Sequence, residues 1–133
     1  MTIVLDASVA VAAARPNEPS HRPSRTRIEA ILAGEDAIVV PSLFSIEVAA
    51  TLARVGAPLP AIRNYVSQLL AVARVVPLGK VASRQVRETA MRWKLRAADA
   101  VYVWVVVRED VALCTLDHEM AKRAGSACEV VAP

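Results

Sequence analysis

Short apolar runs alternate with longer amphipathic stretches along the whole chain. Runs rich in Val, Ile and Leu predict strands at residues 2–5, 37–40, 74–77, 111–115 and 129–131. Apolar positions at helical spacing predict helices over residues 7–14, 24–33, 42–54, 61–73, 80–94, 97–108 and 117–124. Because parallel strands need crossover connections and burial on both faces, this alternation predicts a parallel α/β sheet covered by helices.

Proline positions indicate where some of these elements end. A loop is expected after the first helix, at Pro16, Pro19 and Pro23. Pro41 precedes the 42–54 helix, where its missing N–H costs no hydrogen bond. No repeat, low-complexity tract or long linker interrupts the pattern, so residues 1–133 are expected to form a single domain.

Composition argues against two other classes of protein. With 55 % hydrophobic and 22 % charged residues, this chain of 133 residues is too apolar to be disordered. Its strongest apolar run, residues 97–107, contains Asp99 and is shorter than the roughly 20 residues that a membrane span needs. The N-terminus lacks the basic segment and long apolar stretch of a signal peptide. We therefore expect a soluble, cytoplasmic protein with no membrane association.

Charge and cysteine content narrow the chemistry only slightly. The net charge of +3 is a mild basic excess, and the arginines cluster on polar stretches. Cys114 and Cys128 each lie in a short apolar run, so we expect two buried thiols in neighbouring strands. With two histidines and no Cys-x-x-Cys pair, the chain offers little from which to build a zinc site.

Four acidic residues stand where an α/β sheet binds its ligands. Asp6 follows the first predicted strand and Asp117 follows the fourth, so both are expected at the carboxyl edge of the sheet. Glu47 lies in the first two turns of the helix after the second strand. Asp99 lies in the first turn of the apolar 97–108 helix, where an unpaired carboxylate would be costly to bury.

Each carboxylate also has an ordinary structural alternative. Asp6 and Asp117 have the position of helix N-caps. Glu47 could lie on a solvated helix face, although its neighbours are mostly apolar. Asp99 could pair with Arg96, which lies three residues before it.

A divalent cation would satisfy all four carboxylates together. Oxygen-only ligands favour Mg²⁺ or Mn²⁺, and such an ion can activate water and stabilise charge on a phosphodiester. The hydroxyls of Ser8 and Thr115 stand next to this set and could hold a carboxylate or a metal-bound water, or could serve as local caps.

Four segments that contain these acids resemble the motifs of the PIN-domain nucleases: IVLDAS ending at Ser8, PSLFSIEV beginning at Pro41, LRAADAVY beginning at Leu95 and LCTLD ending at Asp117. Their order, their spacing and the chain length resemble the VapC toxins of type II toxin–antitoxin modules, across essentially the whole chain. The resemblance implies a three-layer α/β/α sandwich with a central, mainly parallel sheet of four to five strands. It also implies a Mg²⁺- or Mn²⁺-dependent endoribonuclease that cleaves structured RNA, either tRNA or rRNA, and that is blocked by the tail of a VapB-type antitoxin.

Carried onto this chain, the resemblance assigns catalysis and metal binding to Asp6, Glu47, Asp99 and Asp117. Ser8 and Thr115 become supporting polar residues. Direct and water-mediated binding of the metal by Asp117 both stay open.

Basic and apolar side chains suggest surfaces for RNA and for partners. Arginines that flank the acids are candidates to bind RNA phosphates, with solvated helix faces as the alternative: Arg15, Arg92 and Arg96. Apolar residues of the 42–54 and 61–73 helices could form an antitoxin groove: Leu43, Leu52, Val55, Ile62, Leu69 and Leu70. A homodimer is expected to use the region around Tyr102 and Val106. For each apolar residue, core packing is the alternative.

Two rival functions remain. The same metal centre could serve a phosphatase or a DNA-directed nuclease, but the chain has no additional nucleophilic Asp-x-Asp motif or phosphate loop. A catalytically inactive binding module with the same fold is the other alternative, and the complete set of four acids argues against it.

Overall fold

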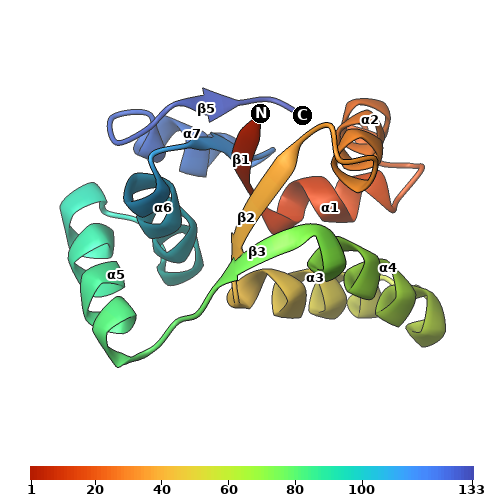
Figure 1. The fold of residues 1–133 in the computed structure, drawn as a ribbon, viewed down its shortest axis with the longest axis horizontal. Coiled ribbons are helices and arrows are strands. Elements are labelled where there is room, and N and C mark those ends of the chain that lie inside the picture. Colours follow the sequence, from red (N-terminus) through yellow and green to blue (C-terminus); the bar gives the residue numbers. More distant parts are fainter.

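The computed structural model, which describes residues 1–133, has five parallel strands in one central sheet (Figure 1). The strands are β1 (Thr2–Leu5), β2 (Ala37–Pro41), β3 (Ala73–Val76), β4 (Ala112–Cys114) and β5 (Val130–Val131). Their order in the sheet is β3-β2-β1-β4-β5, and every neighbouring pair is parallel. The predicted parallel α/β sheet is confirmed.

Seven helices connect the strands: α1 (Ala7–Ala13), α2 (His21–Leu32), α3 (Leu43–Arg54), α4 (Leu59–Val72), α5 (Lys80–Trp93), α6 (Ala97–Glu109) and α7 (His118–Ala124). Helices α1 to α4 lie together on one side of the sheet, and α5 to α7 lie on the other (Figure 1). Right-handed crossovers explain this division, because the chain moves outward from β1 to β3 and then returns to β4 on the other side of β1. The result is the expected three-layer sandwich.

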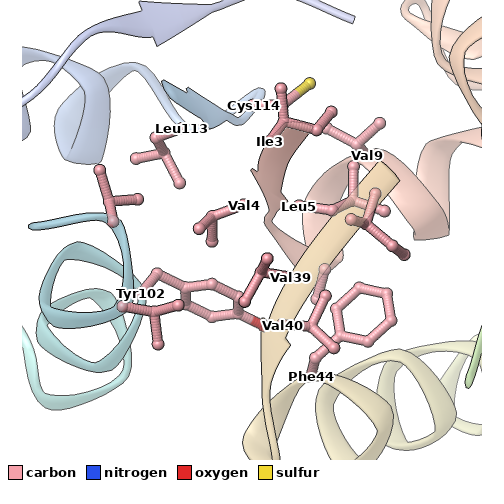
Figure 2. Packing of buried hydrophobic residues seen from close by; sticks show 14 of the residues in the cluster. Ile3, Val4, Leu5, Val9, Val39, Val40, Phe44, Tyr102, Leu113 and Cys114 are labelled. Carbon is pink, nitrogen blue, oxygen red and sulfur yellow. The ribbon is translucent and has the colours of Figure 1, made fainter. Parts of the chain in front are cut away.

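The core explains why the strands are continuously apolar. Ile3, Val4 and Leu5 of β1 are fully buried, since β1 is the central strand and is covered on both faces. Figure 2 shows Val4 on the side of Tyr102 in α6, whereas Leu5 and Val9 lie on the side of α1. Residues 100–106 of α6 are all buried, which agrees with the nearly all-apolar sequence of this helix.

Most predicted boundaries agree with the structure within two residues, and α2 is the exception. It begins at His21 rather than at residue 24, so Pro23 lies in its first turn instead of in a loop. A proline is tolerated there because the first N–H groups of a helix have no partner within the helix. Pro60 occupies the same kind of position in α4.

Burial corrects the predicted homodimer surface. Tyr102 and Val106 are each only 1 % exposed, so both belong to the core and present no surface to a second copy. The error arose because α6 carries no polar face that would distinguish an enclosed helix from one with an exposed apolar stripe.

Three of the residues predicted for the antitoxin groove also belong to the core: Leu52, Ile62 and Leu69. They lie on the inward faces of α3 and α4, where they pack against the hydrophobic cluster. An apolar hollow does lie between α3 and α4, but of the six predicted residues Ile62 alone lines it.

The cysteines agree in part with the prediction. Cys114 is buried in β4, and burial raises the pKa of its thiol to about 11. Cys128 is only half-buried and precedes β5 rather than lying in it. Both are free thiols. None of the seven helices combines the length and the apolar character that crossing a bilayer requires.

Candidate active site

A polar cavity of about 610 Å³ opens at the carboxyl edge of the sheet. The cavity lies beyond the carboxyl ends of β1 and β4. The strand order reverses between these two strands, since β2 and β3 follow on one side of β1 and β4 and β5 on the other. Open α/β sheets bind their ligands at such a switch point. All four predicted acids line it: Asp6, Glu47, Asp99 and Asp117. The fold therefore brings together side chains from four separate segments of the chain.

Asp6 is the most deeply held of these acids. It stands at the N-cap position of α1, yet its carboxylate makes no capping hydrogen bond. Instead, its Oδ2 accepts hydrogen bonds from Ser8 Oγ at 2.5 Å and from Thr115 Oγ1 at 2.9 Å. Burial raises the pKa of Asp6 although these two hydrogen bonds oppose the shift, and the charge of Asp99 adds to the rise.

The two hydroxyls that hold Asp6 are themselves held by the backbone after β4. Ser8 Oγ accepts from the Leu116 N–H at 3.1 Å, and Thr115 Oγ1 accepts from the Asp117 N–H at 3.0 Å. Each hydroxyl must therefore direct its own proton toward Asp6. Ser8 and Thr115 fix the orientation of this carboxylate and link the ends of β1 and β4.

Glu47 reaches the cavity from α3 and meets Tyr102 of α6. The Tyr102 hydroxyl donates a hydrogen bond to Glu47 Oε1 at 2.6 Å. Burial is the main cause of a raised pKa at Glu47, and the charges of Asp6 and Asp99 raise it further. The solvated-face alternative for Glu47 is therefore wrong.

Tyr102 is one residue at the site to which the sequence analysis gave no role there. Its ring is buried in the core while its hydroxyl reaches Glu47, and burial together with this contact raises the pKa of the phenol. A usable signal was present: a buried phenol needs a partner, and Tyr102 stands one helical turn after Asp99 on a helix of aliphatic residues. Glu18 and Thr51 also line the cavity without having been predicted.

Arg96 joins the two outer acids. Its Nε lies 3.1 Å from Asp99 Oδ2, and its Nη2 lies 3.1 Å from Asp117 Oδ2. The alternative pairing of Asp99 with Arg96 is thus present in the structure. Because the Arg96 side chain is 74 % exposed, water competes for it and the pairing is weak.

Asp117 also caps α7, as its alternative predicted. Its Oδ1 accepts from the N–H groups of Glu119 and Met120, at 3.0 and 3.1 Å. Only Oδ2 remains for a ligand, and Arg96 occupies it. This geometry favours a water-mediated role for Asp117 over direct binding of a metal.

The donor set fits a hard divalent cation. Asp6 is buried and Glu47 is half-buried, no cation is among the groups that shift their pKa values, and the charges of other acids raise the pKa of each. Mg²⁺ and Mn²⁺ prefer such oxygen ligands and complete their shells with water. As placed here, no three acidic, histidine or cysteine side chains are close enough to hold an ion alone. Binding would therefore require water ligands or a rotation of a carboxylate.

The three arginines predicted to bind RNA divide into two groups. Arg15 and Arg96 line the acidic cavity, and Arg15 forms an ion pair with Glu18. Arg92 lies outside the cavity, with its guanidinium 5.1 Å from the centre of the Trp93 ring. The acidic cavity thus has basic groups at its edge, but Arg92 is not one of them.

Several solved structures share this fold. The chain is 21 % identical to PAE2754 from Pyrobaculum aerophilum, with a TM-score of 0.70, covering 97 % of this chain and 83 % of that one. The chain is 14 % identical to VapBC2 from Rickettsia felis, which was solved with a DNA fragment from its promoter; the TM-score is 0.73, and the match covers 100 % of this chain and 99 % of that one. The chain is 16 % identical to VapC20 from Mycobacterium tuberculosis, described as a toxin that cleaves the sarcin–ricin loop; the TM-score is 0.73, and the match covers 90 % of this chain and 93 % of that one.

At such low identities these likenesses establish the fold alone, and a search of curated proteins finds no match. The sequence profile of the PIN domain, however, matches residues 3–126, which is nearly the whole chain. That stretch contains all four acids of the cavity. The protein therefore belongs to the PIN domain family.

Proposed function

We propose that the protein is a Mg²⁺- or Mn²⁺-dependent endoribonuclease and the toxin of a type II toxin–antitoxin module. The observation that carries the proposal is the acidic cavity, in which Asp6 is buried and Glu47 is half-buried without a cation while Asp99 and Asp117 complete the rim. Membership of the PIN domain family and the likeness to VapC20 support it. The substrate is structured RNA, either tRNA or rRNA, and we expect the protein to act on it in the cytoplasm.

In this proposal each polar residue has a defined task. Asp6, Glu47 and Asp99 hold the metal ion, and Asp117 contributes through water. When bound, the ion supplies a water that is activated at neutral pH and stabilises charge on the phosphodiester. Ser8 and Thr115 orient Asp6, and the Tyr102 hydroxyl orients Glu47. Such partners of ligands commonly change metal affinity or activity by about 10- to 100-fold.

Cleavage of total RNA by the purified protein tests the reaction. We expect defined fragments with Mn²⁺ and none after chelation with EDTA. Cleavage that survives chelation would contradict the metal mechanism. Preferential cleavage of DNA, or hydrolysis of a phosphomonoester without RNA cleavage, would favour the rival enzymes. Complete inactivity together with tight RNA binding would favour a binding module.

A VapB-type antitoxin is the proposed partner, and an apolar groove between α3 and α4 supports this part. The groove has a volume of about 610 Å³ and a stripe at helical spacing on α3: Ile46, Ala49, Ala50 and Ala53. Ile46 and Leu59 are more than half exposed, at 63 % and 53 %. Small alanines beside exposed Ile and Leu suit an amphipathic helix laid into the groove.

The groove and the acidic cavity lie on two sides of one helix. Glu47 and Thr51 of α3 line the cavity, whereas Ile46 and Ala50 line the groove. An antitoxin helix in the groove would need only a short tail to pass α3 and enter the cavity. Homodimerisation stays a prediction, to be tested by analytical ultracentrifugation of the free protein.

A further inference from the structure

A second, basic cavity of about 360 Å³ lies between the end of α5 and the helix α7. It has four cationic residues and one acid in its wall, together with a half-buried tryptophan and a serine: Arg92, Lys94, Lys122, Arg123, Glu119, Trp93 and Ser126. Neither the proposed metal chemistry nor the antitoxin groove uses this cavity.

Most of its positive charge is uncompensated. Glu119 is the only acid in the wall, and it lies 3.8 Å from Arg123. Arg92, Lys94 and Lys122 form no ion pair within the chain, so three cations remain available for an anion. Such a concentration of charge of one sign around a hollow attracts an anionic ligand.

The wall of the cavity is held in place. Arg123 Nη1 donates a hydrogen bond to the Lys94 carbonyl at 2.5 Å, which links α7 to the end of α5. Lys94 ends α5 in the left-handed conformation, at φ 53°, which glycine would adopt at a lower conformational cost. A lysine therefore stands at a position where the backbone favours glycine, and its side chain adds charge to the cavity.

The geometry relates this cavity to the acidic one. Residues 94–96 connect them, with Lys94 in the basic wall, Leu95 in the core and Arg96 at the acidic rim. Helix α7 spans the same interval from Asp117 to Lys122 and Arg123, roughly 9 Å at the α-helical rise. That separation corresponds to a few nucleotides along a strand.

We propose that the basic cavity binds a backbone phosphate of the RNA substrate, a few nucleotides from the bond that is cleaved; this inference rests on the proposed function. The cavity selects for phosphate rather than for a base, because the Arg92 guanidinium already covers a face of the Trp93 ring. Lys122 and Arg123 supply two of the cationic groups from the last turn of α7, and Arg123 is anchored by the Lys94 carbonyl.

The test measures binding of a fluorescent single-stranded RNA to the full-length protein by anisotropy, in EDTA so that cleavage does not interfere. The variant carries Lys122→Gln and Arg123→Gln. A matched control carries Arg22→Gln and Arg25→Gln on α2, in the opposite layer of the fold. Both pairs remove two charges, and each has one arginine in an i,i+4 pair with a glutamate.

We expect the cavity variant to bind RNA about tenfold more weakly at low salt and to lose about one unit of the salt-dependence slope, while the control changes less than twofold. Lys122→Gln alone, which keeps the hydrogen bond of Arg123 to Lys94, should lose about half of this effect on a logarithmic scale. Excess inorganic phosphate should lower the RNA affinity of the control variant but should lower that of the cavity variant no further. That result would support phosphate as the group that the cavity recognises.

Equal losses in the variant and the control, or no loss in either, would overturn the basic cavity as a binding site. If the wild type cleaves RNA with Mn²⁺ and the cavity variant binds RNA normally, only this inference fails. If the wild type neither binds nor cleaves RNA, the proposed function fails and the inference fails with it.

Discussion

Helix α3 separates two hollows of opposite character. Glu47 faces the acidic cavity, and the adjacent Ile46 faces the apolar groove. The groove is built by one pair of consecutive helices, α3 and α4, so nearby residues suffice to form it. The acidic cavity takes side chains from Asp6 after β1, from α1, α3 and the start of α6, and from the β4–α7 turn, which only the sheet order brings together.

The two hollows also depend on different forces. Apolar area removed from water stabilises a complex at the groove, by about 25 cal/mol per Å². At the acidic cavity, burial and mutual repulsion keep the carboxylates in need of a cation. A change on one side of α3 should therefore leave the function of the other side intact, and the following predictions test that separation.

The largest effect is expected for Asp6→Asn. Removal of this charge should reduce RNA cleavage by at least about 1000-fold, roughly 4 kcal/mol of lost transition-state stabilisation. The matched control is Asp110→Asn, an exposed acid at a left-handed helix end that asparagine tolerates. Gel assays of RNA cleavage with Mn²⁺ measure both variants, and antitoxin binding at the groove should be unchanged in each.

The same variant should change how stability depends on pH without metal. Burial raises the pKa of Asp6 above its usual 3.8, so the folded state holds this proton more tightly than the unfolded state. Its contribution to stability is complete below 3.8 and is lost as pH rises through the raised pKa. The melting temperature measured in EDTA should therefore fall less steeply between pH 4 and 8 for Asp6→Asn than for the wild type. An identical slope would contradict the assignment.

Ile46→Asp should have the next largest effect, on the other side of α3. A charge in the apolar groove should weaken antitoxin binding by about 100-fold, because it must be desolvated against alanines. Val55→Asp is the control, since Val55 is exposed on the same chain segment but outside the groove. Co-purification with the antitoxin reports binding, and cleavage should stay normal. Loss of cleavage in Ile46→Asp would show that the two hollows are coupled.

Tyr102→Phe should act more weakly and only on the acidic side. Loss of the hydrogen bond to Glu47 should lower Mn²⁺ affinity about tenfold and the free energy of unfolding by about 1 kcal/mol. Titration calorimetry and urea unfolding measure the two quantities. A loss of stability with unchanged metal affinity would make Tyr102 a core residue without a role at the site.

The smallest effect is expected for Arg96→Gln, and its sign is opposite. Because Arg96 pairs with Asp99 and Asp117, its removal should raise Mn²⁺ affinity roughly threefold in the absence of RNA. Arg92→Gln, four residues earlier and outside the acidic cavity, should leave metal affinity unchanged. Weaker metal binding in Arg96→Gln would mean that the guanidinium organises the site rather than competing for it.

Individual residues show which features of the fold and of the site could be predicted from the sequence. The strands and helices followed from local periodicity, and Asp6 and Asp117 were placed at the sheet edge because they directly follow predicted strands. The prediction for Tyr102 and Val106 was wrong, since an all-apolar helix carries no pattern that separates an enclosed face from an exposed one. The groove was assigned to the correct helices but largely to the wrong residues, because Leu52 and Leu69 face inward.

The sequence by itself determined the alternation of strands and helices and the placement of the four acids relative to strand ends and helix starts, because these depend on residues close together in the chain. Only the tertiary structure decided the contacts between distant residues. Thr115 donates to Asp6 across 109 positions, Tyr102 reaches Glu47 across 55, and Arg96 joins Asp99 to Asp117. Such contacts depend on the order of the strands and the packing of α6 against the sheet, which no local pattern of residues specifies.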